Sequence, residues 1–317
     1  MTHSPKVSIG VPVFNGEQFL AAAVESLLAQ KYADFEIILC DNASTDGTGD
    51  ICRHFAALDP RVRYHRNDRN IGPHPNFKLA FELARAPYFR WHAHDDLVDP
   101  EHLGRCVAAL ESTPGAVLAQ SLVRIVDPDG IELGVYDSGL NGASSESPSR
   151  RFAALIFSRH LCTEMFGVMR SSALRQTALL RDYYGGDRAL LAEMSLLGRI
   201  VQVPEPLFSN REHPGRGSRA VKPADHQTSA KEVRQNRAAP LMWNLWADYR
   251  RAVRQHIADP AERRRYRAYL LGWWFVDWNA ARLAMDVVGL AYPGIYEFVN
   301  RLKLRFLGPL PQIGLRR

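Results

Sequence analysis

The stretch that decides how this chain is interpreted is Tyr88-Phe89-Arg90-Trp91-His92-Ala93-His94-Asp95-Asp96-Leu97-Val98-Asp99-Pro100. Its first residues form an aromatic run that favours a buried strand, and His94, Asp95 and Asp96 stand where that strand should end. Adjacent carboxylates repel each other, and Mg²⁺ or Mn²⁺, which prefer oxygen ligands and also hold phosphate oxygens, would neutralise them. The stretch therefore indicates a metal and phosphate site at a strand end, where open α/β sheets bind ligands.

A plainer interpretation of the same stretch is an acidic turn that caps the helix after it. Asp99 suits the N-cap position of that helix, and Pro100 suits its first residue. The capping interpretation explains Asp99 but leaves Asp95 and Asp96 without a role, so both interpretations stay open on these residues alone.

Composition and net charge indicate what kind of protein this is. The chain has 317 residues, of which 46% are hydrophobic, so it can bury a large core. Its net charge of +6 favours an anionic partner, such as nucleotide phosphate, lipid headgroups or nucleic acid, without choosing among them. The four cysteines lack the spacing of a metal site, and the sequence shows no signal peptide and no uninterrupted apolar span. We therefore expect a cytoplasmic protein, with peripheral contact at the inner face of a membrane as an open alternative.

Strands and helices alternate through the first hundred residues. The pattern predicts strands at 7–13, 35–40, 62–65 and 88–92, and helices at 17–30, 46–58 and 76–84. Alternation at this pace implies right-handed βαβ units and a mostly parallel sheet. The first hundred residues are thus typical of a nucleotide-binding half.

Two loops of small polar residues follow the first two strands. Phe14-Asn15-Gly16 and Asp41-Asn42-Ala43-Ser44-Thr45-Asp46-Gly47-Thr48 can bend tightly and offer backbone amides to a ligand. Helix capping explains Ser44 and Asp46 equally well. It does not explain Asp41, a carboxylate at the end of the second strand.

Four segments in order and register resemble the family-2 inverting glycosyltransferases: Val7–Asn15, Asp41–Thr48, Asn70-Ile71-Gly72 and His94-Asp95-Asp96. The resemblance covers about the first 215 residues. It implies the GT-A type of fold, an α/β domain whose nucleotide-binding, mostly parallel sheet is flanked by helices. It also implies a donor site formed by Pro12, Val13, Phe14, Asn15, Glu17, Asp41, Asn42, Asn70, Gly72, Asn76, His94, Asp95 and Asp96.

Within that implied site, Phe14 would pack on the base, and Asp96 would bind Mg²⁺ or Mn²⁺ bridging the diphosphate, assisted by His213. Two positions depart from the family pattern. Asn42 stands where many relatives have a second Asp, and His92 stands where they have an acidic residue. Asparagine can still hydrogen-bond a base edge, so the resemblance leaves the identity of the base open.

A second informative segment is Gly185-Gly186-Asp187, at the start of a predicted helix with apolar residues at helical spacing. An Asp at this position is usually a helix cap. The resemblance instead implies that Asp187 is the general base, and that His213 closes the catalytic domain near the diphosphate.

The sequence after the catalytic segment changes character. Residues 216–240 are rich in Gly, Ser, Arg and Lys and predict a flexible basic loop, and residues 241–317 predict a helical extension rich in aromatic residues. Aromatic stripes on helices usually pack into a core. Dimerisation, or contact of Arg263–Arg267 and Tyr296–Leu307 with a membrane surface, are the alternatives.

These observations predict a metal-dependent inverting glycosyltransferase of the hexosyltransferase type, for polysaccharide, glycolipid or other glycoconjugate synthesis. Its cofactor would be Mg²⁺ or Mn²⁺, its donor a nucleotide-diphosphate sugar and its acceptor a saccharide or a lipid-linked molecule, with no nucleic-acid partner. A sugar-phosphate nucleotidyltransferase is disfavoured, because Phe14-Asn15-Gly16-Glu17 stands where such enzymes carry a basic glycine-rich loop. An inactive binding scaffold is the other alternative, although Asp96 and Asp187 are both present.

Overall fold

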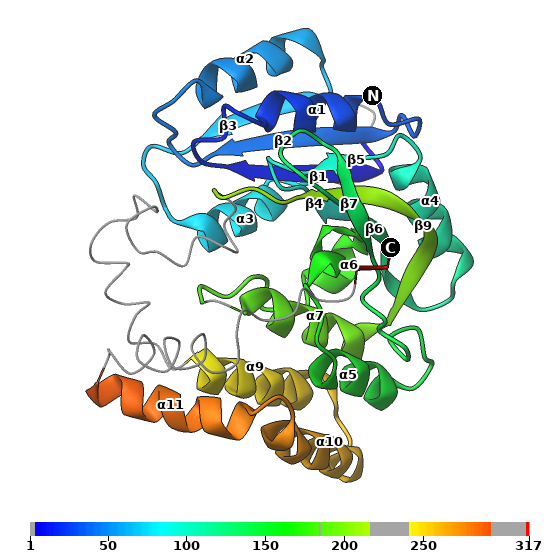
Figure 1. Ribbon diagram of the computed structural model, residues 1–317. Helices are drawn as coiled ribbons and strands as arrows, with labels where there is room; N and C mark the ends of the chain where they lie inside the picture. The colour runs from blue at the N-terminus through cyan, green and yellow to red at the C-terminus, as the bar shows by residue number, and fades with distance from the viewer. Residues whose placement is uncertain (1–3, 184, 216–240, 293–314, 317) are drawn as a thin grey trace.

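A computed structural model describes residues 4–183, 185–215, 241–292 and 315–316 (Figure 1). Strand β1 runs along the middle of the first half of the sheet, parallel to β2 on one side and β4 on the other, with β3 beyond β2. The elements of this half are β1 (Val7–Val13), α1 (Leu20–Leu28), β2 (Phe35–Asp41), α2 (Thr48–Leu58), β3 (Val62–Arg66), α3 (Pro73–Glu82) and β4 (Tyr88–Trp91). Every predicted strand and helix of the first hundred residues is confirmed.

The pattern of buried residues explains why these segments form strands and helices. All seven residues of β1 and all seven of β2 are buried, as expected for strands covered on both faces. Helix α1 contributes Leu20, Val24 and Leu27 to the same core, at the helical spacing that the sequence displays.

The second half of the sheet is mixed. Its long strands β6 and β9 pair in parallel, whereas β4 with β8, β6 with β8 and β5 with β9 each align only two residues in antiparallel pairs. The elements are β5 (Leu97–Val98), α4 (His102–Ser112), β6 (Ala116–Val126), β7 (Glu132–Tyr136), α5 (Pro148–Phe157), η1 (Thr163–Phe166), β8 (Val168–Arg170), α6 (Ser171–Leu174), α7 (Gly186–Leu197) and β9 (Arg199–Arg211).

Strand β9, like the shorter β5 and β7, is an element that the sequence pattern does not indicate. It pairs with β5, directly after the acidic turn, through Leu97 opposite Ser209 and Val98 opposite Phe208. This pairing returns the chain to the Asp95-Asp96 turn more than a hundred residues later. Residues 210–213 are thereby placed beside the strand end that the sequence singled out.

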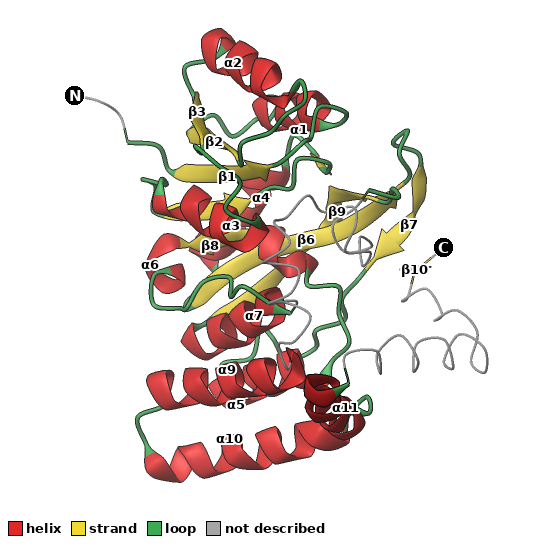
Figure 2. Cartoon of the chain, turned by 90° about the vertical axis from the view of Figure 1, so that its left-hand side faces the viewer, coloured by secondary structure: helices red, strands yellow, loops and turns green. Residues whose placement is uncertain are grey.

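The C-terminal segment forms helices where the structure describes it. Helices α9 (Leu241–His256), α10 (Pro260–Gly272) and α11 (Asn279–Ala291), with the short η2 (Trp273–Phe275), lie at the end of the molecule opposite α2 (Figure 2). Helix α9 lies level with α5, both contact α7, and α10 lies beyond them. Strand β10 (Leu315–Arg316) pairs with β7. The loop predicted at 216–240 and the amphipathic segment Tyr296–Leu307 lie outside the described residues.

The C-terminal helices and the second half of the α/β unit share one hydrophobic core. Phe152 of α5 meets Tyr249 of α9 and Tyr266 of α10 edge to face, with ring centroids 5.9 and 5.5 Å apart. Leu190 of α7 belongs to the same buried cluster. Among the helices that the structure describes, none combines the length and apolar character that crossing a bilayer requires.

Candidate functional site

The loops after β1, β2 and β4 meet at one edge of the sheet. Val13 lies opposite Asp41 in the parallel register, and the His92 amide donates to the Gly10 carbonyl at 2.9 Å. Pro12 and Val13 are buried strand residues, Phe14 is half-buried just beyond them, and the carboxyl ends of the strands thus carry the predicted donor residues. This is the edge at which open α/β sheets bind ligands.

Asn15 and Glu17 fasten the β1 loop to the β2 loop. The Thr45 amide donates to Asn15 Oδ1 at 2.8 Å, and the Gly47 amide donates to Glu17 Oε2 at 2.7 Å. Between them, Gly16 lies against the His94 ring so closely that a Cβ there would stand 2.6 Å from His94 Cδ2. The three strand-end loops are therefore tied together by side-chain and close backbone contacts.

The carboxylate of Asp41 is fully buried and has its own partners. Its Oδ1 accepts a hydrogen bond from the Ser44 amide at 2.8 Å, and its Oδ2 accepts from the Tyr64 hydroxyl at 2.9 Å and from Arg66. The Arg66 side chain is 43% exposed, so this guanidinium joins the buried acid to the surface. Arg66 and Tyr64, at the end of β3, are members of the site that the sequence pattern did not identify.

Asn42 is the centre of a buried amide network. Its Nδ2 donates to Asn70 Oδ1 at 2.8 Å and to the Gly72 carbonyl at 3.2 Å, while its Oδ1 accepts from Asn67 at 3.0 Å and from the Ile71 amide at 2.9 Å. These four hydrogen bonds use the full capacity of the side chain. The departure from Asp at this position is thus explained, because a carboxylate could not donate to Asn70 or Gly72.

The same network reaches α3. Asn67 also donates to Asn76 Oδ1 at 3.0 Å, and Asn76 donates to the Cys40 carbonyl at 2.8 Å. Asn70, Gly72 and Asn76, all predicted at the donor site, therefore hold the segment after β3 against the end of β2. Asn67 was missed, although its spacing before Asn70 on the same loop could have indicated it.

Asp95 faces His213. Its Oδ2 lies 2.9 Å from His213 Nε2, and both side chains are 11% exposed. Burial by itself would raise the pKa of Asp95, but the imidazoles of His94 and His213 outweigh it and hold that pKa below its ordinary value. Phe19 packs on the His213 ring with centroids 4.8 Å apart and so fixes the imidazole in place.

Asp96 turns the other way, toward β9. Asn210 donates to both of its carboxylate oxygens at 3.1 Å, and the Arg211 amide donates to its Oδ1 at 2.8 Å. The Arg211 guanidinium donates to the Asp95 carbonyl at 2.8 Å and lies over the Phe19 ring. Asn210 and Arg211, which the sequence pattern also missed, therefore shape the acidic turn from β9.

His92 supports the acidic turn from beneath. Its Nδ1 accepts from buried Arg90 at 3.2 Å, which leaves its Nε2 to donate to the Asp96 carbonyl at 3.2 Å. Burial, and then the charge of Arg90, lower the pKa of His92 well below its ordinary value, so the ring is neutral. The His92 departure thus supplies a donor to the turn, which an ionised acid could not do.

Asp187 lies in the first turn of α7 and is half-buried. Burial and the Asp187 carboxylate raise the pKa of the Cys162 thiol well above its ordinary value, so Cys162 is a neutral neighbour of this acid. The segment before it contacts α3, since Asp182 Oδ1 lies 3.1 Å from His74 Nδ1. This contact ties the segment before α7 to α3, which begins directly after Gly72.

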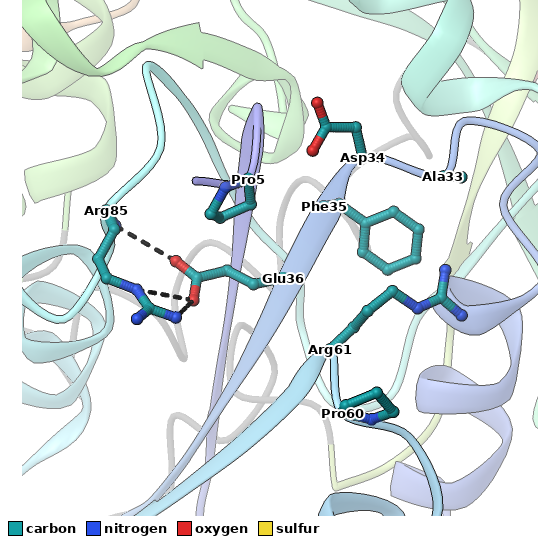
Figure 3. A pocket seen from close by; sticks show the side chains of 8 residues that line it. All are labelled: Pro5, Ala33, Asp34, Phe35, Glu36, Pro60, Arg61 and Arg85. Carbon is teal, nitrogen blue, oxygen red and sulfur yellow. Dashed lines mark hydrogen bonds and ion pairs between the residues drawn. The ribbon is translucent and has the colours of Figure 1, made fainter. Parts of the chain in front are cut away.

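Two hollows lie at opposite edges of the sheet. One, of 480 Å³, follows β3 at the donor edge and is lined by His65, Arg66, Asn67, Asp68, Arg69 and Ile71. The other, of 390 Å³, lies at the amino ends of the strands and is lined by Pro5, Ala33, Asp34, Phe35, Glu36, Pro60, Arg61 and Arg85 (Figure 3). Glu36 and Arg85 pair across the second hollow at 2.7 Å, so their charges are already matched. The hollow after β3 is the one that lies at the edge bearing the predicted donor residues.

Asp95 Oδ2 and His213 Nε2 form a hydrogen bond at 2.9 Å. Two ligands at right angles around an octahedral ion, each about 2.1 Å from it, would also lie about 3 Å apart, so a divalent cation could replace the proton that the pair shares. Within the described part of the chain, no three His, Cys, Asp or Glu side chains gather as a complete metal site. The remaining ligands would have to come from phosphate oxygens or water, as is usual for Mg²⁺ and Mn²⁺.

Known proteins resemble this chain in sequence. An uncharacterized glycosyltransferase of Haemophilus influenzae is 26% identical over 241 residues, which are 74% of each chain. The uncharacterized protein y4gI of Sinorhizobium fredii is 37% identical over 118 residues, and this match spans 37% of the present chain but only 13% of y4gI.

Solved structures share the fold. TarS residues 1–349 of S. aureus, also determined in complex with UDP, superposes with a TM-score of 0.61 at 17% identity, covering 85% of this chain and 72% of TarS 1–349. The mannosyltransferase PcManGT of Pyrobaculum calidifontis, determined with GDP-Man and Mn²⁺, gives a TM-score of 0.51 at 17% identity, covering 96% and 82%. These likenesses confirm the predicted GT-A type of α/β fold.

The sequence profile of glycosyl transferase family 2 matches residues 8–177, which is more than half of the chain. That span contains the strand-end loops, the asparagine network and the acidic turn. The predicted family is therefore confirmed: this chain belongs to glycosyl transferase family 2.

Proposed function

We propose that this protein transfers a sugar from a nucleotide-diphosphate donor to an acceptor hydroxyl, with inversion at the anomeric carbon, and that residues 1–215 carry the chemistry. The observation that carries the proposal is the Asp95–His213 pair at the sheet edge that also bears Asp41 and the hollow after β3. Family membership and the nucleotide complexes of TarS and PcManGT support a nucleotide-sugar donor.

For the metal, we propose Asp95 with His213 and revise the expectation that Asp96 is the ligand. The Asp96 carboxylate accepts three hydrogen bonds from β9 and is 2% exposed, which suits a group that shapes the turn. A bound Mg²⁺ or Mn²⁺ would neutralise the charge that grows on the departing diphosphate. Asp96 in this proposal keeps Asp95 oriented through the backbone of the turn.

The roles of the nucleotide-side residues also change. Asn42 has no free hydrogen-bonding capacity for a base edge, so its role is to shape the loop at residues 67–72. Arg66, half exposed at the hollow after β3, is the better placed group for contact with the nucleotide, while Phe14 remains the proposed surface for the base.

Asp187 is the proposed general base. From the first turn of α7, where it is half-buried, it would accept the proton of the acceptor hydroxyl as that oxygen attacks the anomeric carbon. A base of this kind contributes about 10²–10⁴-fold to the rate. Base and departing diphosphate on opposite faces of the sugar would produce inversion. The acceptor, saccharide or lipid-linked, lies on the Asp187 side in this proposal.

The proposal is tested by measuring binding and transfer separately. Thermal shift with UDP, GDP, dTDP and CMP, each with and without Mn²⁺, should show stabilisation by one nucleotide that requires the ion, because a ligand that binds only the folded state raises its stability. The stabilising nucleotide then selects the sugar donors for a transfer assay with read-out of anomeric configuration. Stabilisation that is independent of metal, or a product with retained configuration, would contradict the proposal.

A further inference from the structure

The corner between α10 and α11 exposes large apolar side chains. Phe275 is 86% exposed, Trp278 is 80% exposed and Leu271 is 62% exposed. These three residues, at the end of α10, in η2 and at the start of α11, form what we call the aromatic corner. It lies in the helical layer farthest from the nucleotide-binding strands (Figure 2).

Neighbouring aromatic residues are packed inward, so exposure at the corner is selective. Trp273 is only 3% exposed, and the Trp274 ring meets Trp243 and Trp246 edge to face, with centroids 5.5 and 5.8 Å apart. A packed aromatic cluster thus lies beside the corner. Phe275 and Trp278 nevertheless point to solvent.

The backbone of the corner is strained and firmly held. Asp277 and Trp278 have φ angles of 51° and 63°, a left-handed conformation that non-glycine residues seldom adopt. Asp277 pairs with Arg159 at 2.6 Å, and the buried Asn279 side chain donates to the Trp273 carbonyl at 2.9 Å. Strain of this kind persists where the surrounding contacts impose it and is concentrated at functional positions. Trp278 is one of the two left-handed residues that join η2 to α11.

Cations flank the aromatic corner. Arg264 and Arg267 precede Leu271 by seven and four residues on the exposed face of α10, and Arg282 follows Trp278 by one turn on α11. All three arginines are exposed. The nearby acids are engaged elsewhere, Asp277 with Arg159 and Asp286 with the amide of Met242. The exposed charge around the corner is therefore positive.

We propose that the aromatic corner docks on an anionic lipid surface, with Phe275 and Trp278 entering the headgroup region and Arg264, Arg267 and Arg282 meeting lipid phosphates. Aromatic residues favour this boundary, since their rings bury apolar surface while staying near water, and arginines beside them add electrostatic attraction. Protein interfaces are also enriched in aromatic residues and arginine, so self-association is the outcome that the experiment must separate from lipid binding. This inference does not depend on the proposed sugar transfer.

The test is flotation of the full chain with vesicles of phosphatidylcholine alone or mixed with phosphatidylglycerol. We expect flotation with the anionic vesicles and loss of it at high salt. The double variant Phe275→Ser with Trp278→Ser should bind about tenfold more weakly. Arg264→Gln with Arg267→Gln should weaken binding by about fivefold per arginine. The matched control is the double variant Leu58→Ser with Ile131→Ser, whose residues lie outside the corner and are 65% and 63% exposed. This variant should bind vesicles like the parent.

Two results would overturn the inference. One is a parent protein that does not float with anionic vesicles. The other is equal flotation of the parent and the Phe275→Ser, Trp278→Ser variant. Sedimentation of the parent and of the aromatic variant without vesicles accompanies these measurements. If the parent does not bind vesicles but self-associates, and the aromatic variant does not self-associate, the corner contacts a second copy of the chain instead of lipid. Circular dichroism checks that each variant is folded.

Discussion

Asn210 donates its side-chain amide to both carboxylate oxygens of Asp96 at 3.1 Å, so β9 holds the second of two adjacent acids while the first faces His213. The two acids that look equivalent in the sequence have different environments. This difference can be tested by replacing each of them.

Asp95→Asn should weaken Mn²⁺-dependent nucleotide binding by at least about tenfold with little change in stability, since it removes a ligand charge from a partly accessible pair. Asp96→Ala should lower the free energy of unfolding by about 1–3 kcal/mol, because the Asn210 amide loses its buried acceptor. Calorimetric titration and urea unfolding measure the two effects. If Asp96→Ala stays stable but loses metal-dependent nucleotide binding, while Asp95→Asn keeps it, then Asp96 rather than Asp95 is the metal ligand.

His213→Ala should change which metal supports nucleotide binding. Imidazole nitrogen is a better ligand for Mn²⁺ than for Mg²⁺, which prefers oxygen ligands. We expect the ratio of nucleotide affinity in Mn²⁺ to that in Mg²⁺ to fall in the variant. Phe19→Leu, which removes the ring beneath His213 but leaves the imidazole, serves as the matched control. An unchanged ratio in His213→Ala would show that this side chain does not ligate the ion.

Asp187→Asn should lower kcat by about 10²–10⁴-fold and leave nucleotide affinity unchanged, because it preserves size and removes the base. Glu193→Gln on the same helix is a control, since Glu193 is 2% exposed and engaged by His256 at 3.0 Å. Glu193→Gln should lower the free energy of unfolding and leave both kcat and nucleotide affinity of the folded protein unchanged. Near-parental turnover of Asp187→Asn would exclude it as the base.

Asn42→Asp should destabilise the protein although relatives carry Asp at this position. The carboxylate cannot donate to Asn70 Oδ1 or the Gly72 carbonyl, and one of its oxygens would face these two oxygen acceptors. We expect a loss of about 1–3 kcal/mol in the free energy of unfolding, measured with urea. Asn70→Asp on the same loop tests whether the network as a whole is responsible. Full stability of Asn42→Asp would show that the network rearranges freely.

Glu36 should make stability depend on pH in the acid range. Burial would raise the pKa of Glu36, but hydrogen bonds from Arg85, Ser8 and Arg63 outweigh it and lower that pKa. Figure 3 shows the contact with Arg85. The contribution of an acid with a lowered pKa is complete above its unfolded value, about 4.3, and is lost as the pH falls through the folded value. Urea unfolding at pH 6 and about pH 3.5 should therefore show a smaller drop in Glu36→Gln than in the parent. An equal drop would assign the acid sensitivity to other carboxylates.

Local patterns in the sequence determined the first half of the fold. The apolar runs at Val7–Val13 and Phe35–Cys40, with helical spacing between them, are signals carried by neighbouring residues, and the structure has strands and helices where they predict them. The place of the acidic turn followed from the same signals, because a strand end is a local feature. The family motifs are found on those ends for the same reason.

Only the tertiary structure decided which acid faces His213, why Asn42 and His92 are not acidic, and that α9–α11 share a core with α5 and α7. Each of these depends on contacts between residues far apart in the chain, such as β9 with the turn after β4, and no local period encodes such a pairing. The sequence placed two carboxylates side by side, and the strand that returns from residue 199 to residue 211 directed them to different partners.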